Sequence, residues 1–279
     1  MGIVELNQEY FYKNYRKDVK RLERKFSAKL KIMIEGRTID NREILSFFAG
    51  NGSKCILITG GVHGRESNNT IVLMHLLEEF LSKAKEEYTL CVMPLLNPDG
   101  YAIATEGFSA IQNGNIREEV ESEGICWQEW KGNAIGIDIN RNFPSLYWQK
   151  KEQEQFPGSE EETRAFMRVC NRYPFDLYLD FHSRGEEIYY YRQSMDSIYN
   201  EKQRLLAEKM QQLSGYTLVL PERELDTKTG GGNTVHYTSE KFRIPSFTIE
   251  TMPDESGFPA DVSLQERVYH QIKELPFVI

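Results

Sequence analysis

The sequence predicts an α/β fold in which a mixed, mostly parallel central sheet is flanked by helices. Short apolar segments with strand character alternate along the chain with longer amphipathic segments, an order that is typical of parallel sheets covered by helices. Two of the short segments, Cys55–Thr59 and Thr89–Leu96, are apolar almost throughout, as expected of strands covered on both faces. Because no sharp change in composition divides the chain, we expect residues 1–279 to form a single domain.

The composition is that of a globular protein with an acidic surface. Hydrophobic residues make up 40% of the chain, and the net charge of −8 disfavours nucleic acid or an anionic membrane as the main partner. No segment approaches the ~18 consecutive apolar residues of a membrane helix. The first residues lack the basic and apolar regions of a signal peptide, which predicts a cytoplasmic location. The oligomeric state is left open by the sequence.

Apolar spacing and turn signals define the elements of the first half. Large apolar side chains recur at steps of three and four near the start, so residues 1–28 are expected to form a helical extension. Alternating apolar side chains predict strands over Lys29–Ile34 and Glu43–Phe48. A long helix is expected over Ser67–Lys85, between the two apolar strands, and Asn97–Gly100 (Asn-Pro-Asp-Gly) is a strong turn signal.

The second half continues the alternation after a polar interruption. The Gly-containing segment Gln112–Asn133 is expected to be a surface excursion, and the capping-box spacing of Ser159 and Glu162 predicts the start of a helix. The remaining elements are strands over Phe175–Phe181, Ile188–Tyr191, Tyr216–Leu220 and Ser246–Thr251, helices over Met195–Leu213 and from Val262 onward, and a Gly-rich loop over Thr229–Asn233. The total is about eight strands, enough for one large sheet.

Titratable side chains follow three of the expected strands at the points where these strands end. His63 and Glu66 follow the strand that ends at Thr59, and His182 follows a later one. In open α/β sheets, sites form beyond the carboxyl ends of strands, so these side chains are expected to meet. Two imidazoles and one carboxylate form a complete protein ligand set for catalytic zinc, with the fourth position left for water. Glu250, near the end of the last strand, is the candidate base for that water.

Taken alone, each of these residues has a simpler explanation. The spacing of His63 and Glu66 often occurs by chance, and a single histidine at a strand end is frequently structural. A closed structural zinc site would need another Cys or His nearby, and none is evident. The four cysteines are far apart and are expected to be reduced. His236, after the Gly-rich loop, is a candidate for lining a pocket, with a structural role as the alternative.

Five motifs in a fixed order resemble zinc carboxypeptidases of the carboxypeptidase A type. They are Gly60–Glu66, Asn97–Tyr101, Gly136–Pro144, Asp180–Ser183 and Ser246–Glu250. The resemblance extends from about Leu30 to the C-terminus and implies a carboxypeptidase A-like fold, one Zn²⁺ per chain and a peptide substrate with a free carboxylate. The zinc site built from two histidines and one glutamate is the one known for carboxypeptidase A itself.

The resemblance also implies a role for each matching side chain. His63, Glu66 and His182 would bind zinc. Glu250 would be the general base and, later, the proton donor. Arg65 would help to polarise the scissile carbonyl group or would hold the substrate.

Substrate binding follows the family pattern only in part. Asn140 and Arg141 would bind the terminal carboxylate of the substrate, since a guanidinium group matches a carboxylate with two hydrogen bonds. The family has a further arginine that stabilises the oxyanion, and here Lys131 aligns with it, with Arg117 as the alternative. The family's mobile tyrosine is not evident, because residues 224–236 contain no tyrosine.

One branch of the family matches more closely around the third expected ligand. The segment His182–Tyr191 is similar to bacterial enzymes that cut γ-D-glutamyl–diaminopimelate bonds in cell-wall peptides. Arg184 and Glu186 would lie beside the metal and read a charged end of the substrate, unless they pair with each other on a loop. Two other functions remain open: a zinc-dependent deacylase of N-acyl amino acids, and a catalytically silent peptide-binding module.

Overall fold

The computed structural model describes residues 2–83, 85–150, 156–224 and 232–279. One eight-stranded sheet runs through this part of the chain. Its strands are β1 (Leu30–Arg37), β2 (Glu43–Gly50), β3 (Lys54–Thr59), β4 (Tyr88–Met93), β5 (Leu177–Ser183), β6 (Glu187–Tyr189), β7 (Thr217–Leu218) and β8 (Ser246–Thr251). Their order across the sheet is β1-β2-β4-β3-β5-β8-β6-β7.

The centre of the sheet is parallel and its flanks are mixed. Strands β4, β3, β5 and β8 pair in parallel. Strand β2 pairs with β4 and with β1 in antiparallel fashion, and β6 is antiparallel to β8. The prediction of a mixed, mostly parallel α/β sheet is therefore confirmed.

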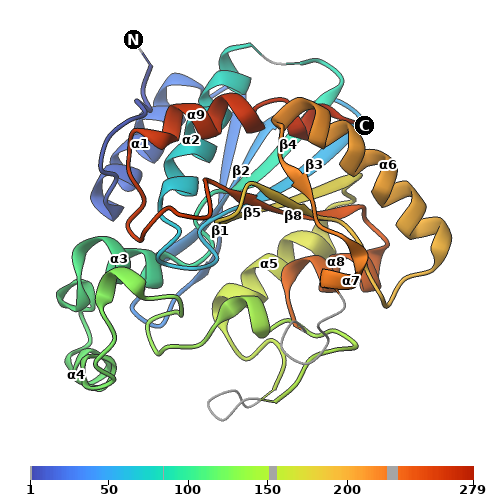
Figure 1. Ribbon diagram of the computed structural model, residues 1–279. Helices are drawn as coiled ribbons and strands as arrows, with labels where there is room; N and C mark the ends of the chain where they lie inside the picture. The colour runs from blue at the N-terminus through green and yellow to red at the C-terminus, as the bar shows by residue number, and fades with distance from the viewer. Residues whose placement is uncertain (1, 84, 151–155, 225–231) are drawn as a thin grey trace.

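Helices cover both faces of the sheet (Figure 1). The helices are α1 (Tyr12–Lys25), α2 (Asn68–Ser82), α3 (Pro98–Glu106), α4 (Gly114–Ser122), α5 (Glu161–Arg172), α6 (Ser197–Ser214), α7 (Pro221–Glu224), α8 (Thr234–Phe242) and α9 (Leu264–Ile272). Side chains of α1, α2, α6 and α9 pack into one apolar core, and side chains of α5 and α8 pack into a second.

The two cores explain why the central strands are apolar along their whole length. Successive side chains of a strand point to opposite faces of the sheet. In β3, Ile56 and Ile58 accordingly lie in the first core, and Leu57 lies in the second. A polar side chain at any of these positions would be buried, because both faces of the sheet are covered by helices.

Two segments that were expected to be irregular are helical. The prediction of a turn at Asn97–Gly100 is wrong, since α3 begins at Pro98. The Asn97 side chain accepts a hydrogen bond from the backbone N–H of Gly100 at 2.9 Å, and proline at the first helical position leaves no donor unsatisfied. The expected excursion over 112–133 contains α4, whose Val120 packs with Trp130 in a small third core.

Local signals failed at two further positions. Ser159 does not cap α5: the N-cap is Glu160, and the Ser159 hydroxyl instead accepts from Asn142 and donates to Glu160. In β1, the alternation breaks at a register shift between Ile34 and Gly36, which leaves Ile34 exposed. Most of the expected Gly-rich loop lies outside the described residues.

Three smaller observations complete the comparison of the fold with the sequence. Within the described residues, no helix combines the length and apolar character needed to cross a lipid bilayer. All four cysteines are free thiols: Cys91 and Cys170 are buried, Cys55 is half-buried and Cys126 is exposed. Strand β5 runs to Ser183, so the third expected zinc ligand lies within a strand rather than after it.

Glu162 gives a testable link between the fold and pH. Its carboxyl group is buried in α5, and Oε1 has no hydrogen-bond partner among the described residues. Burial raises the pKa of Glu162 to about 8, and the carboxylates of Asp99 and Glu160 add to this effect. The folded protein therefore keeps a proton that the unfolded chain releases near pH 4.5. As a result, stability should fall as the pH rises between these two values.

Replacing Glu162 by glutamine should remove this dependence. We expect a gain in the free energy of unfolding that is small at pH 5 and roughly 1–3 kcal/mol at pH 8. Denaturant unfolding at pH 5 and pH 8 measures this gain in the free energy of unfolding. Glu118→Gln, at an exposed position of α4, is the control. An equal gain at pH 5 and pH 8 would contradict the prediction.

Candidate metal centre and active site

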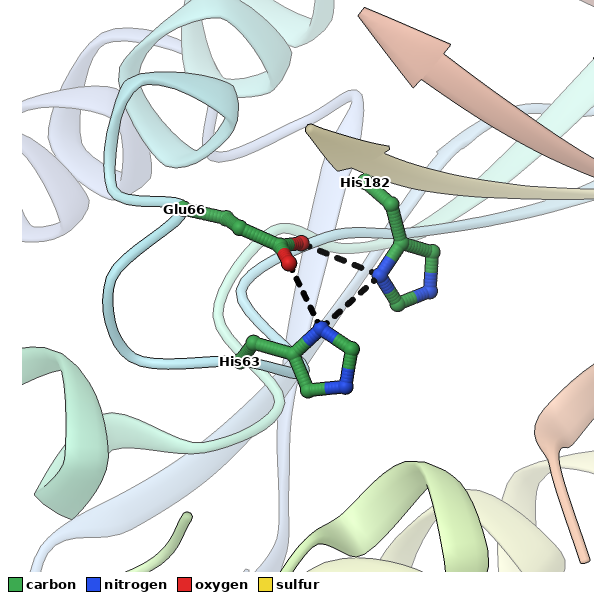
Figure 2. Close-up of side chains that lie close together, drawn as sticks. All are labelled: His63, Glu66 and His182. Carbon is green, nitrogen blue, oxygen red and sulfur yellow. Dashed lines mark hydrogen bonds and ion pairs between the residues drawn. The ribbon is translucent and has the colours of Figure 1, made fainter. Parts of the chain in front are cut away.

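Three side chains converge at the carboxyl ends of two neighbouring parallel strands (Figure 2). The Nδ1 atom of His63 lies 2.7 Å from Oε1 of Glu66 and 3.2 Å from Nδ1 of His182. His182 Nδ1 lies 3.0 Å from Oε2 of Glu66. All three residues are buried. The structure thus brings together the three residues that the sequence predicts as zinc ligands.

The loop that carries two of these side chains is fixed by close backbone contacts. It connects β3 to α2, and the N–H of Arg65 donates to the carbonyl of Trp130 at 2.9 Å. A Cβ atom at Gly64 would lie 2.2 Å from the backbone oxygen of Gly100, so no larger residue fits there. This packing sets the positions of His63 and Glu66 before any ligand binds.

Each histidine turns its second nitrogen toward a further carboxylate. His63 Nε2 lies 3.3 Å from Oδ1 of Asp138, and His182 Nε2 lies 3.0 Å from Oδ2 of Asp180. Histidines that bind metals usually make such a contact, which fixes the ring and makes the free nitrogen a better ligand. Both Nδ1 atoms are therefore oriented to share one cation with Glu66.

The charges around the centre also favour a cation. Burial alone would raise the pKa of Glu66, but the two imidazoles hold it well below its usual range. Burial alone would lower the pKa of His182, but Asp180 and Glu66 raise it well above its usual value. A buried centre that stabilises positive charge, with two nitrogen ligands and one oxygen ligand, fits Zn²⁺.

Glu250 lies next to this centre on the adjacent strand β8. Its Cα atom is paired with that of His182 in the sheet, so the two side chains are neighbours. Burial raises the pKa of Glu250 to about 8; His182 opposes this shift, and Glu66 adds to it. Glu250 and the three candidate ligands line one pocket of about 370 Å³.

Cationic side chains form much of the remaining wall of this pocket. It is lined by Arg65, Lys131, Asn140, Arg141 and Arg184, all predicted from the sequence as catalytic or substrate-binding residues. The Nζ atom of Lys131 is 2.8 Å from Oδ2 of Asp138, the carboxylate that also contacts His63. Asn140 accepts a hydrogen bond from the backbone of Thr234 at 3.3 Å, which ties this wall to the start of α8.

Three residues that were expected at the site do not line the pocket. Arg117 lies on α4, and His236 lies on α8. Burial lowers the pKa of His236 to about 3, with Arg192 and Arg141 adding to the effect, so this imidazole is neutral at ordinary pH. Glu186, the expected neighbour of Arg184, instead pairs with Arg267 at 2.5 Å.

Several residues at or beside the pocket were not assigned a role from the sequence, among them two aspartates, a tyrosine and a phenylalanine. Asp138 and Asp180 lie inside two of the five family motifs, and their place in these motifs could have predicted a role at the site. Tyr189 and Phe258 line the pocket itself; Tyr189 lies in the His182–Tyr191 segment, whereas no motif marks Phe258. The Tyr189 hydroxyl donates to Oε2 of Glu187 at 2.9 Å.

The fold and the site together define an α/β protein with a candidate metal centre of the kind found in metal-dependent hydrolases. A sheet-edge centre of two histidines and one glutamate, with a further carboxylate beside it, is the arrangement of such proteins. The family model described as zinc carboxypeptidase matches residues 15–272, and the chain belongs to this family.

Similar proteins with curated descriptions include active and inactive members. The chain is 27% identical over 241 residues to protein YqgT of Bacillus subtilis, covering 75% of this chain and 62% of that protein. It is 23% identical over 305 residues to γ-D-glutamyl-L-diamino acid endopeptidase 1 of Lysinibacillus sphaericus, covering 96% and 72%. It is 28% identical over 242 residues to the inactive metallocarboxypeptidase ECM14 of Saccharomyces cerevisiae, covering 74% and 53%. The chain thus spans less than two thirds of the length of two of these three relatives.

Solved structures share the fold at low sequence identity. Carboxypeptidase A from Helicoverpa armigera superposes with a TM-score of 0.77 at 18% identity, covering 96% of this chain and 72% of that one. Murein-tripeptide amidase MpaA from Escherichia coli O157 gives a TM-score of 0.60 at 20% identity, covering 88% and 90%. The carboxypeptidase A-like architecture is thereby established.

Proposed function

We propose that this chain is a zinc-dependent peptidase that hydrolyses an amide bond close to a free C-terminal carboxylate. The observation that carries the proposal is the convergence of His63, Glu66 and His182, with Glu250 on the neighbouring strand and Arg141 in the same pocket. The inactive relative shows that family membership alone does not establish activity. In this chain, all three candidate ligands and the candidate base are present.

The residues of the pocket divide the chemistry between them. A zinc ion held by His63, Glu66 and His182 would polarise the scissile carbonyl group and supply a water nucleophile with a pKa lowered to ~7. The carboxylate of Glu250 accepts one proton from the attacking water. It then delivers this proton to the amide nitrogen as the carbon–nitrogen bond breaks, which yields a carboxylate and an amine. Lys131 stabilises the negative charge that develops on the carbonyl oxygen.

Substrate orientation follows from the side chains around this centre. Arg141 and Asn140 hold the terminal carboxylate of the substrate, which sets the distance between that carboxylate and the scissile bond. Arg65, which borders the same pocket, contacts the part of the substrate on the acyl side.

Two relatives indicate a substrate class. The name of one relative refers to γ-D-glutamyl-L-diamino acids, and the name of one structural neighbour refers to murein tripeptide. We infer that cell-wall peptides with a γ-D-glutamyl–diaminopimelate bond are substrates of this chain. The cytoplasmic location expected from the sequence stays a prediction, as do the deacylase and silent-module alternatives.

The test combines metal analysis of the purified protein with a mass-spectrometric screen. The screen contains γ-D-glutamyl-diaminopimelate, ordinary peptides and N-acyl amino acids, each with a free or an amidated C-terminus. We expect zinc in equimolar amount and cleavage of the free-acid peptides. Arg141→Gln should lower kcat/KM for the free-acid peptides by about 10- to 100-fold. The variant should change kcat/KM for the amidated peptides very little. Preferential cleavage of the acyl amino acids would favour the deacylase, and a zinc-loaded protein that cleaves none of these compounds would contradict the proposal.

A further inference from the structure

Two arginines of the pocket meet the same aromatic ring. The guanidinium carbon of Arg65 lies 4.7 Å from the centre of the Phe258 ring, and that of Arg184 lies 5.1 Å from it. We call this group the arginine clamp. An aromatic ring holds a guanidinium group through its face and leaves the N–H groups at the edge available for a ligand. All three residues line the pocket that contains the metal centre.

The clamp carries positive charge that close carboxylates do not neutralise. Arg65 is 3.5 Å from Glu129, and Arg184 is 4.0 Å from Asp254, whose side chain is 90% exposed. Arg184 otherwise donates to the backbone carbonyl of Ser256, and Nε of Arg65 is buried without a hydrogen-bond partner in the described part of the chain. The two contacts with carboxylates are longer than the ~2.8 Å of a strong charge-assisted hydrogen bond, so the clamp retains donors for an anion.

The clamp and Arg141 are held by opposite helical layers. Arg65 lies in the loop that leads into α2, and Phe258 lies between β8 and α9. The side chain of Asn68 in α2 donates to the carbonyl of Ala260 at 3.1 Å, which fixes the Phe258 segment to the same layer. The wall that carries Arg141, by contrast, is tied to α8 on the other layer. The pocket that contains the metal centre thus holds two cationic groups that rest on different supports.

We propose that the arginine clamp binds a carboxylate that the substrate carries on the acyl side of the scissile amide. The inference rests on the proposed function, in which Arg141 holds the carboxylate on the amine side. In a γ-linked glutamyl residue the side-chain carbonyl forms the amide, and the α-carboxylate remains free beside it. An ordinary α-linked peptide presents a neutral backbone amide at this place. The clamp therefore selects γ-glutamyl amides, with one carboxylate on each side of the reacting bond.

The test uses two substrates that differ only in this carboxylate. One is γ-D-glutamyl-diaminopimelate, and the other is the same compound with its glutamyl α-carboxylate converted to the carboxamide. We expect the wild-type protein to have a kcat/KM about 10- to 100-fold higher for the carboxylate form, as for a hydrogen-bonded charge pair. Arg184→Ala should lose most of this preference by lowering kcat/KM for the carboxylate form alone, and Arg184→Lys should retain part of it. Arg204→Ala, on α6 and outside the pocket, is the matched control.

Each other outcome has a separate meaning. If the wild type cleaves both substrates equally, or if Arg184→Ala slows both equally, the clamp is refuted and the hydrolase proposal stands. The second result would indicate that Arg184 only supports the loop through Ser256. If a zinc-loaded protein cleaves other free-acid peptides but neither γ-glutamyl compound, the proposed substrate class and the proposed role of the clamp are both refuted. If it cleaves no peptide at all, the proposed function itself has failed.

Discussion

Replacing Glu250 by glutamine is expected to lower kcat by about 10²- to 10⁴-fold while zinc stays bound. Glutamine keeps the size of the side chain but cannot accept a proton from water. Glu250 is not one of the three converging ligands, so its replacement leaves the two histidines and Glu66 in place. Steady-state kinetics on a peptide that the wild type cleaves, together with metal analysis of the same sample, measures both effects.

Glu187→Gln provides a matched control for this variant. Glu187 lies on β6, where its Cα atom is paired with that of Glu250, but it does not line the pocket. A uniform effect of removing one negative charge near the centre would lower kcat equally in both variants. A normal kcat in Glu250→Gln would refute the assignment of the base, whereas a loss of zinc in that variant would show that Glu250 supports the metal centre.

The fold could be predicted from the sequence where a local pattern of residues is compatible with only one kind of secondary structure. The uninterrupted apolar segment of β3 arises because its side chains alternate between two cores, and only a strand covered on both faces requires this pattern. At Asn97–Gly100, by contrast, the same residues serve tight turns and helix starts, and the helix was missed. The register shift after Ile34 coincides with a distant contact, in which Nε of Arg168 donates to the carbonyl of Glu35 at 2.8 Å. No local pattern contains that information.

The metal ligands could be predicted for a topological reason. Parallel strands that are neighbours end at the same edge of the sheet, so His63 and His182 meet although 118 residues separate them along the chain. The residues that support or extend the site are harder to find. Asp138 and Asp180 act through the second nitrogen of each histidine, and this relation exists only in three dimensions. Phe258 belongs to a connecting segment without a motif, and its role depends on two arginines from other segments.

The largest effect is expected from removal of a ligand, and here the readout does not require activity. A ligand that binds only the folded state stabilises it by about 2.7 kcal/mol at 100 times its Kd, which corresponds to an increase in Tm of roughly 5 °C for a chain of this size. Zinc added to the metal-free wild type should therefore raise Tm. In His182→Ala this increase should disappear and hydrolysis should fall to background, because the two remaining side chains cannot complete the site.

A graded series separates a metal centre from a purely structural hydrogen-bonded cluster. Asp180→Asn keeps the volume beside His182 Nε2 but removes the negative charge, so zinc affinity should fall by about 10- to 100-fold without being lost. His270→Ala, at an exposed position on α9, should bind zinc as the wild type does. If zinc failed to change Tm in the wild type, or changed it equally in His182→Ala, the converging side chains would be a structural cluster. The proposed chemistry would then have no metal on which to depend.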